Sequence, residues 1–303
     1  MISRLLLHAS ESKKLEQMVS RSRLTRGLVN RYVAGNTLDD ALTVTAALKS
    51  KGIDVSLDLL GESVTDLIES ERATKEYLEA IQAIPKHVPG STISVKPSQL
   101  GMVVDKDACA RNLSTLLAAA ADNGVVVEVD MEQSAVGPST LEAYRALLPK
   151  YPDTRVAMQA AVRRTQDDLE SFTEPKPRIR LVKGAFKETL AVAVQDKDEV
   201  TYRYLKMSEW ALANLPDPAF GTHDDRCINH VKATAERLGV DRRNFEFQML
   251  FGVRRKLWTQ LVQEGYRVRI YLPYGTAWYP YLMRRMAERP ANLLLFVRSL
   301  VGG

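Results

Sequence analysis

The segment 269–289, RIYLPYGTAWYPYLMRRMAER, joins a strand signal directly to a helix signal. Its first half alternates, is rich in β-formers and ends in Pro-Tyr-Gly, which predicts a strand that stops at Gly275. Its second half places Trp278, Tyr281 and Arg285 at helical spacing. The segment therefore predicts one strand–helix unit, with aromatic rings and a pair of arginines near the end of the strand.

The same strand-then-helix pattern recurs through the upstream sequence. Expected strands begin near Ile53, Thr92, Val125, Thr154, Arg178, Ala219, Phe245 and Val268. Expected helices cover 65–84, 105–123, 139–149, 164–172, 199–213, 224–238, 253–264 and 277–289. Strict alternation predicts a parallel sheet, and eight units in about 250 residues predict a closed (β/α)8 barrel of the TIM type.

The first fifty residues precede this pattern. Thr37 is an expected N-cap, with Asp39 and Asp40 in the first turn of a helix that runs to Lys51 and stops at Gly52. We therefore expect a helical lead-in over residues 1–50 and a barrel over residues 51–303, with a helical C-terminal end.

The composition narrows the class of protein. Of 303 residues, 45% are hydrophobic and the net charge is +5, with Lys and Arg scattered rather than clustered, so no nucleic acid partner is expected. No apolar run approaches the ~20 residues of a membrane span. Two cysteines exclude a disulfide framework, and His223 and His230 flank Cys227 without a recognised zinc spacing, so no metal is expected. A cytoplasmic protein, with weak attraction to the inner face of a membrane, is expected.

Polar side chains end nearly every expected strand. They are Asp58, Glu62, Lys96, Asp130, Glu132, Gln159, Arg180, Lys183, Thr222, His223, Gln248 and Tyr271. Barrel enzymes build their active sites at the carboxyl ends of the strands, and buried polar groups cost free energy unless they are paired. This convergence predicts an enzyme rather than a basic binding module, whose charges would spread over a solvent face.

Several of these residues allow more than one interpretation. Lys96 could form a Schiff base, bind an anion, pair with Asp130, or be a surface lysine whose stem lies along apolar surface. The pair Arg284 and Arg285 suits a carboxylate or phosphate, but it could also belong to a solvated helix face.

A set of short motifs occurs in order at the expected strand ends. They are Leu60-Gly61-Glu62, Ser94-Val95-Lys96, Asp130-Met131-Glu132, Met158-Gln159-Ala160, Arg180 to Ala185, Thr222-His223, Gln248-Met249-Leu250, Tyr271-Leu-Pro-Tyr-Gly, and Tyr281-Leu-Met-Arg-Arg-Met-Ala-Glu. Together they resemble the flavin-dependent proline dehydrogenase family, in its monofunctional bacterial form, over about residues 53–292. The barrel expected from the alternation agrees with the fold of that family.

The resemblance implies FAD-dependent oxidation of L-proline to Δ1-pyrroline-5-carboxylate, with hydride transfer to flavin N5. It is the first step of proline catabolism, with electrons passed to a quinone and the product passed to a separate dehydrogenase. The implied catalytic residues are Lys96, Asp130, Arg180 and Tyr271. Implied substrate contacts are Lys96, Leu250, Tyr271, Tyr281, Arg284, Arg285 and Glu62. Implied FAD contacts are Met131, Gln159, Arg180, Lys183, Gly184, Ala185, Thr222 and His223.

One position departs from the family, and one alternative stays open. Phe186 stands where the family usually has Tyr, so a hydroxyl is absent there. Glu62 and Arg284 are expected to form an ion pair that closes the site over substrate. The alternative enzyme class is a lysine Schiff-base aldolase, which would be colourless where a flavoprotein is yellow.

Overall fold

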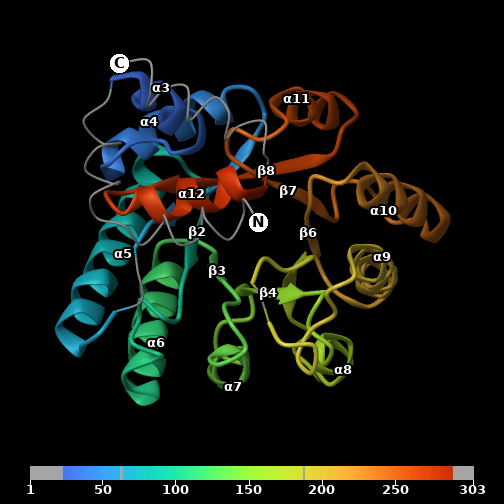
Figure 1. Ribbon diagram of the computed structural model, residues 1–303, viewed down its shortest axis with the longest axis horizontal. Helices are drawn as coiled ribbons and strands as arrows, with labels where there is room; N and C mark the ends of the chain where they lie inside the picture. The colour runs from blue at the N-terminus through green and yellow to red at the C-terminus, as the bar shows by residue number, and fades with distance from the viewer. Residues whose placement is uncertain (1–22, 62–63, 187, 289–303) are drawn as a thin grey trace.

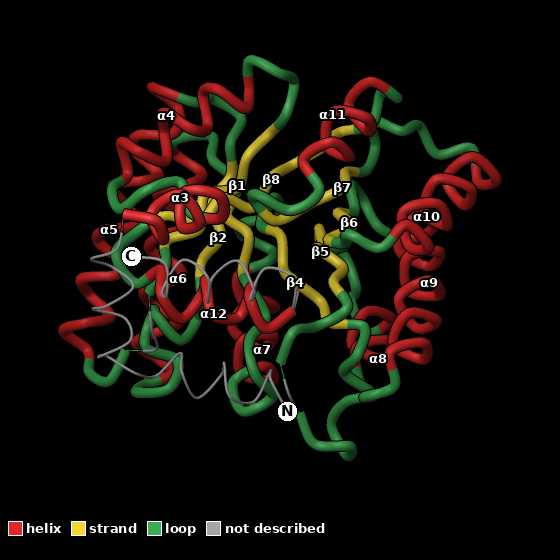
Figure 2. Tube along the Cα trace, turned by 45° about the horizontal axis from the view of Figure 1, so that its top comes forward, coloured by secondary structure: helices red, strands yellow, loops and turns green. Residues whose placement is uncertain are grey.

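The computed structural model describes residues 23–61, 64–186 and 188–288, which form a closed barrel ringed by helices (Figures 1 and 2). The strands are Asp54–Leu59 (β1), Thr92–Val95 (β2), Val127–Val129 (β3), Arg155–Gln159 (β4), Arg178–Val182 (β5), Ala219–Gly221 (β6), Glu246–Leu250 (β7) and Arg267–Tyr274 (β8). They neighbour one another in chain order, and every neighbouring pair is parallel. The predicted (β/α)8 barrel is confirmed.

Helices alternate with these strands. They are Arg23–Tyr32 (α3), Leu38–Lys49 (α4), Leu67–His87 (α5), Lys106–Asp122 (α6), Gly137–Leu147 (α7), Thr165–Glu170 (α8), Lys197–Asn214 (α9), Asp225–Leu238 (α10), Arg255–Gln263 (α11) and Trp278–Glu288 (α12). None of these described helices has both the length and the apolar character needed to cross a membrane.

The predicted strand starts lie within two residues of the observed ones, but several helix bounds differ. The helix expected at 65–84 is Leu67–His87. The helix expected at 164–172 is only Thr165–Glu170. The helix expected to reach Lys51 ends at Lys49, because the chain turns through Gly52 at φ +73°. Its start is as predicted: Thr37 and Asp40 each bond the other's backbone N–H in a capping box.

Aspartates cap four of the helices that follow strand ends. Asp66, Asp105, Asp196 and Asp224 are the N-caps of α5, α6, α9 and α10, and each accepts hydrogen bonds from backbone N–H groups of the first turn. Carboxylates at these ends also complement the helix dipole. The caps fix where each chain segment leaves the strand-end face of the barrel.

The barrel interior contains a buried ionic network. Glu246 of β7 accepts hydrogen bonds from Arg155 Nη1 at 2.8 Å and from Arg269 Nε at 2.9 Å. Glu128 of β3 accepts one from Arg180 Nη2 at 2.6 Å. All five residues are at most 5% exposed. Although burial opposes ionisation, Arg269 and Arg155 lower the pKa of Glu246 to about 2.

This network predicts a large effect on stability. Glu246→Gln should lower the free energy of unfolding at pH 7 by ~3–5 kcal/mol, because it leaves buried guanidinium charge uncompensated. The folded-state pKa is depressed, so this contribution is complete above pH 4.5 and is lost as the pH falls toward 2. Urea unfolding of the unaltered protein and of Glu246→Gln should show that the difference between their free energies of unfolding shrinks as the pH falls from 4.5 toward 2.

The matched control is Glu209→Gln, which removes an ion pair with Arg237 between α9 and α10 at the surface. It should cost under about 1 kcal/mol. If Glu246→Gln and Glu209→Gln lower the free energy of unfolding equally, the interior network does not stabilise the fold more than a surface ion pair does.

Candidate active site

Lys96 is the centre of the site, directly after β2. Its Nζ donates to the carboxylate of Asp58 on β1 and to the hydroxyl of Tyr271 on β8, the latter at 3.2 Å. It also lies 3.5 Å from Asp130 Oδ2. The Lys96 side chain is 19% exposed whereas that of Asp58 is 1% exposed, so Lys96 is the member of the pair that reaches solvent.

Asp130 joins this group to the barrel interior. Its Oδ2 accepts from Tyr271 OH at 2.6 Å and its Oδ1 from Arg180 Nη1 at 2.6 Å. The other terminal nitrogen of Arg180 bonds Glu128 at 2.6 Å and Ser94 Oγ at 2.9 Å. The guanidinium also lies 5.2 Å from the centre of the Tyr271 ring. The four expected catalytic residues therefore form one hydrogen-bonded group.

The charge state of Lys96 bears on the Schiff-base alternative. Burial favours the neutral amine, but Asp58 and Asp130 outweigh that effect and raise the pKa of Lys96. A Schiff base needs a free amine, which is usually obtained by lowering the pKa of the lysine. The surroundings of Lys96 therefore disfavour an aldolase and favour a fixed cation that binds an anion.

The expected flavin contacts of β4 and β5 lie side by side. Gln159, at the end of β4, donates to the backbone carbonyl of Glu132 at 2.9 Å. A Cβ added to Gly184, whose φ is +106°, would lie 3.0 Å from Gln159 Oε1. Gly184 and Ala185 are exposed, so their backbone is open to a ligand. Phe186, which replaces the usual Tyr, is 41% exposed.

Lys183 lies beyond the end of β5, so it does not continue the alternation that points Arg180 into the barrel. Its Nζ donates to Asp224 Oδ2 and to Thr201 Oγ1, each at 2.7 Å. Burial raises the pKa of Asp224, but hydrogen bonds from Lys183 and Arg226 outweigh that effect and lower it to about 2. Lys183 is thus a fixed cation at the start of α10.

Thr222 and His223 follow β6 and contact β7. The hydroxyl of Thr222 accepts from the backbone N–H of Asp224 at 3.1 Å. His223 Nε2 accepts from the backbone N–H of Leu250 at 3.0 Å, so this ring nitrogen carries no proton. Leu250 is opposite Tyr271 in the β7–β8 register, which brings the expected ring contacts of the substrate next to this histidine.

Helix α12 carries the remaining expected substrate contacts. Tyr281 is 6% exposed and packs in an apolar cluster that joins α12 to the end of α3 and to Leu60 after β1. The guanidinium of Arg285 lies 5.3 Å from the centre of the Tyr281 ring. The expected pair of Glu62 and Arg284 lies outside the described residues and side chains.

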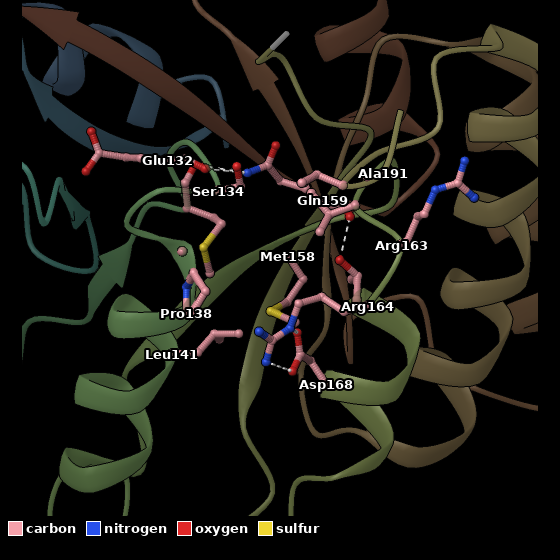
Figure 3. A pocket seen from close by; sticks show the side chains of 15 residues that line it. Glu132, Ser134, Pro138, Leu141, Met158, Gln159, Arg163, Arg164, Asp168 and Ala191 are labelled. Atoms are coloured by element: carbon pink, nitrogen blue, oxygen red, sulfur yellow. Dashed lines mark hydrogen bonds and ion pairs between the residues drawn. The ribbon is translucent and has the colours of Figure 1, made fainter. Parts of the chain in front are cut away.

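A cavity of about 300 Å³ lies on the helix side of β4, between α7 and α8 (Figure 3). Its walls include the thioethers of Met131 and Met158, and Gln159 and Glu132 lie at its edge. The loop before α9 contributes Ala191 and Val192 to its wall. This loop is tied to the lining residue Ser134, whose backbone N–H donates to Glu188 at 2.7 Å. The cavity is mainly apolar and meets the strand ends where flavin contacts are expected.

The sequence left the role of Asp58 unassigned, although this residue is the nearest carboxylate to Lys96. The signal was present, because Asp58 is the one charged residue within the apolar run of β1 after Asp54. The sequence also left Glu128 and Ser94 unassigned, and both hold Arg180. Their partners come from strands far apart in the chain.

The sequence matches the family described as proline dehydrogenase over residues 41–296. It is 35% identical over 294 residues to proline dehydrogenase 2 of Bacillus subtilis (strain 168), covering 97% of each chain. It is 35% identical over 307 residues to the proline dehydrogenase of Deinococcus radiodurans, covering 98% of this chain and 97% of that one.

Among solved structures, the fold is similar to proline utilization A (PutA) from Bdellovibrio bacteriovorus inactivated by N-propargylglycine. The TM-score is 0.82 at 26% identity. The match covers 88% of this chain and 33% of that one, so it spans about a third of the PutA protein.

The contact of Gly184 with Gln159 predicts different costs for two glycine substitutions. Gly184→Ala should lower the free energy of unfolding by ~1 kcal/mol more than Gly124→Ala. Gly124 has φ +62° and nothing within 4 Å of an added Cβ, whereas Gly184 has φ +106° and contacts at 3.0 and 3.4 Å. Urea unfolding measures both, and equal costs would show that Gly184 is not packed against Gln159.

Proposed function

This chain belongs to the proline dehydrogenase family of oxidoreductases, and on that premise we propose that it uses FAD to oxidise L-proline to Δ1-pyrroline-5-carboxylate. The observation that carries the proposal is the position of the Lys96 ammonium. The Lys96 side chain is 19% exposed at the strand-end face, and its Nζ lies 5.7 Å from the centre of the Tyr271 ring. A fixed cation beside an aromatic ring suits a small ring that carries a carboxylate.

The site has a cationic group for the carboxylate of proline and an apolar group for its ring. Lys96 with Arg284 and Arg285 would hold the proline carboxylate, because charge-assisted hydrogen bonds are the strongest available there. Tyr271, Leu250 and Tyr281 would pack on the pyrrolidine ring. Glu62 would pair with Arg284 over bound substrate and exclude water.

The residues near β4, β5 and β6 fit FAD. The backbone at Gly184 and Ala185 is exposed and, at Gly184, adopts a φ that a side chain would strain, which permits close approach by a ligand. Met131, Gln159, Arg180, Lys183, Gly184, Ala185, Thr222 and His223 would hold the cofactor. When bound, FAD supplies the acceptor for a hydride from the ring carbon beside the nitrogen.

The remaining parts of the reaction sequence are also proposed. Electrons would leave by way of a quinone, and the product would pass to a separate dehydrogenase. The net charge of +5 would favour transient contact with an anionic membrane surface. Residues 1–50 would act as a helical lead-in to a barrel over 51–303, with α4 at the end of the lead-in packed against β1 and β8.

The cofactor assignment predicts a yellow protein with non-covalent FAD. Acid precipitation should release all of the flavin into the supernatant, where chromatography should identify it as FAD. Colour retained in the pellet, or FMN in the supernatant, would contradict the assignment.

The carboxylate assignment predicts a selective binding defect. Arg285→Met should raise KM for proline roughly 30-fold or more, because the lost charge-assisted contact is worth ~2–4 kcal/mol. Arg237→Met, a surface substitution on α10, should leave KM unchanged. Prolinol, which lacks the carboxylate, should be a poor substrate of the unaltered protein, and efficient turnover of prolinol would give the arginine another role.

A further inference from the structure

Proline oxidation needs a proton acceptor as well as a hydride acceptor, and the inference below rests on the proposed function. A secondary amine is protonated at neutral pH, since amines of this kind titrate near 10. The nitrogen lone pair must form the new C=N bond as hydride leaves the neighbouring carbon. The ammonium proton therefore has to go to a group of the protein before or during that step.

Asp130, Glu132 and His223 lie near the site, but each already accepts hydrogen bonds from other groups of the protein. Asp130 accepts from Tyr271, Arg180 and, at longer range, Lys96. Glu132 accepts the backbone N–H of Ser98 at 2.7 Å and its hydroxyl at 2.6 Å, one on each oxygen. A proton on either carboxylate would break strong, charge-assisted or paired hydrogen bonds.

His223 is committed as well, because its Nε2 accepts the backbone N–H of Leu250. Asp58 differs from all three. It lies at the end of a buried strand, 1% exposed, and its principal donor is the ammonium of Lys96, which can itself give up a proton. Burial raises the pKa of Asp58 above its ordinary value although Lys96 lowers it, so a proton on this carboxylate costs less than it would in water.

We propose that Asp58 is the terminal proton acceptor of the reaction and that Lys96 relays the proton to it. Lys96 first gives one ammonium proton to Asp58, so that a Lys96 N–H bond breaks and an O–H bond forms. The amine lone pair on Lys96 then takes the proton of the substrate ammonium, whose N–H bond breaks as a new N–H bond forms on Lys96. The substrate becomes a neutral amine, Lys96 stays a cation, and Asp58 becomes a neutral acid. No further oxidant, reductant or proton source is required for this exchange.

The charges around Asp58 favour transfer of the proton from substrate toward Asp58. The ionisable groups that face Asp58 are Lys96 after β2, Asp130 after β3, Tyr271 and Tyr274 of β8, and Tyr77 of α5. Without substrate, Lys96 and Arg180 balance Asp58 and Asp130. A substrate ammonium would add a positive charge to a site that also has the arginines of α12 for its carboxylate, so loss of its proton is favoured.

The test is Asp58→Asn, which retains an oxygen for Lys96 but cannot take up the proton at neutral pH. With proline, kcat/KM should fall ~10²-fold or more at pH 7. It should then rise about tenfold per pH unit toward pH 9.5, because only substrate that is already deprotonated reacts. The unaltered protein should be flat over the neutral range, and its turnover of proline tests the proposed function separately.

Binding of tetrahydrofuran-2-carboxylate separates proton transfer from structure. This analogue has an ether oxygen in place of the amine and therefore has no proton to lose. Its Kd should change less than about threefold in Asp58→Asn. The matched control is Asp54→Asn on the same strand, where the carboxylate pairs with Lys49 at the opposite end of the barrel. Its pH profile should be that of the unaltered protein.

Three results for Asp58→Asn would overturn the proposal and leave Asp58 as a positioning residue for Lys96. They are a loss in kcat/KM that is equal at every pH, an unchanged dependence of kcat/KM on pH, and a loss of affinity for the analogue that matches the loss in kcat/KM. If Asp58→Asn does not yield folded protein, Lys96→Met breaks the same relay at its other end. It should show the same tenfold rise per pH unit, and a profile of unaltered shape would overturn the relay.

Discussion

The hydrogen bond between Arg180 and Glu128 is the interaction on which the site and the barrel both depend. Glu128 also accepts from Thr92 on β2 and Gln248 on β7, so one buried carboxylate ties together strands from opposite sides of the barrel. Such a charge is stable only when its partners are in place, because the cost of desolvation is large. Closure of the barrel and placement of these charges are therefore one event.

The same contact positions the candidate active site. Arg180 holds Glu128 with one nitrogen and Asp130 with the other, and Asp130 in turn fixes the hydroxyl of Tyr271. The interior charges balance in number. The cations are Lys96, Arg155, Arg180 and Arg269, and the carboxylates are Asp58, Glu128, Asp130 and Glu246. A site built on rigid strands can hold polar groups at fixed distances, whereas the loop through Gly184 can adapt to a ligand.

The residue types at the strand ends were readable from the sequence, but their pairing was not. Lys96 and Asp130 were expected to pair, and they lie 3.5 Å apart, yet the closer carboxylate is Asp58. Which of two aspartates is nearer depends on the stagger between β1, β2 and β3, which no local pattern encodes. The predicted N-cap at Thr37 was correct because a cap depends only on four consecutive residues.

By itself the sequence determined the alternation of strands and helices, the closed barrel, the family, and the side chains that end each strand. These follow from periodicity, caps and short motifs, which are local in the chain. Tertiary structure alone decided that Arg155, Arg180 and Arg269 share two glutamates inside the barrel, and that Asp58 lies beneath Lys96. Those contacts join residues separated by 23 to 91 positions, and they exist only once eight strands have closed.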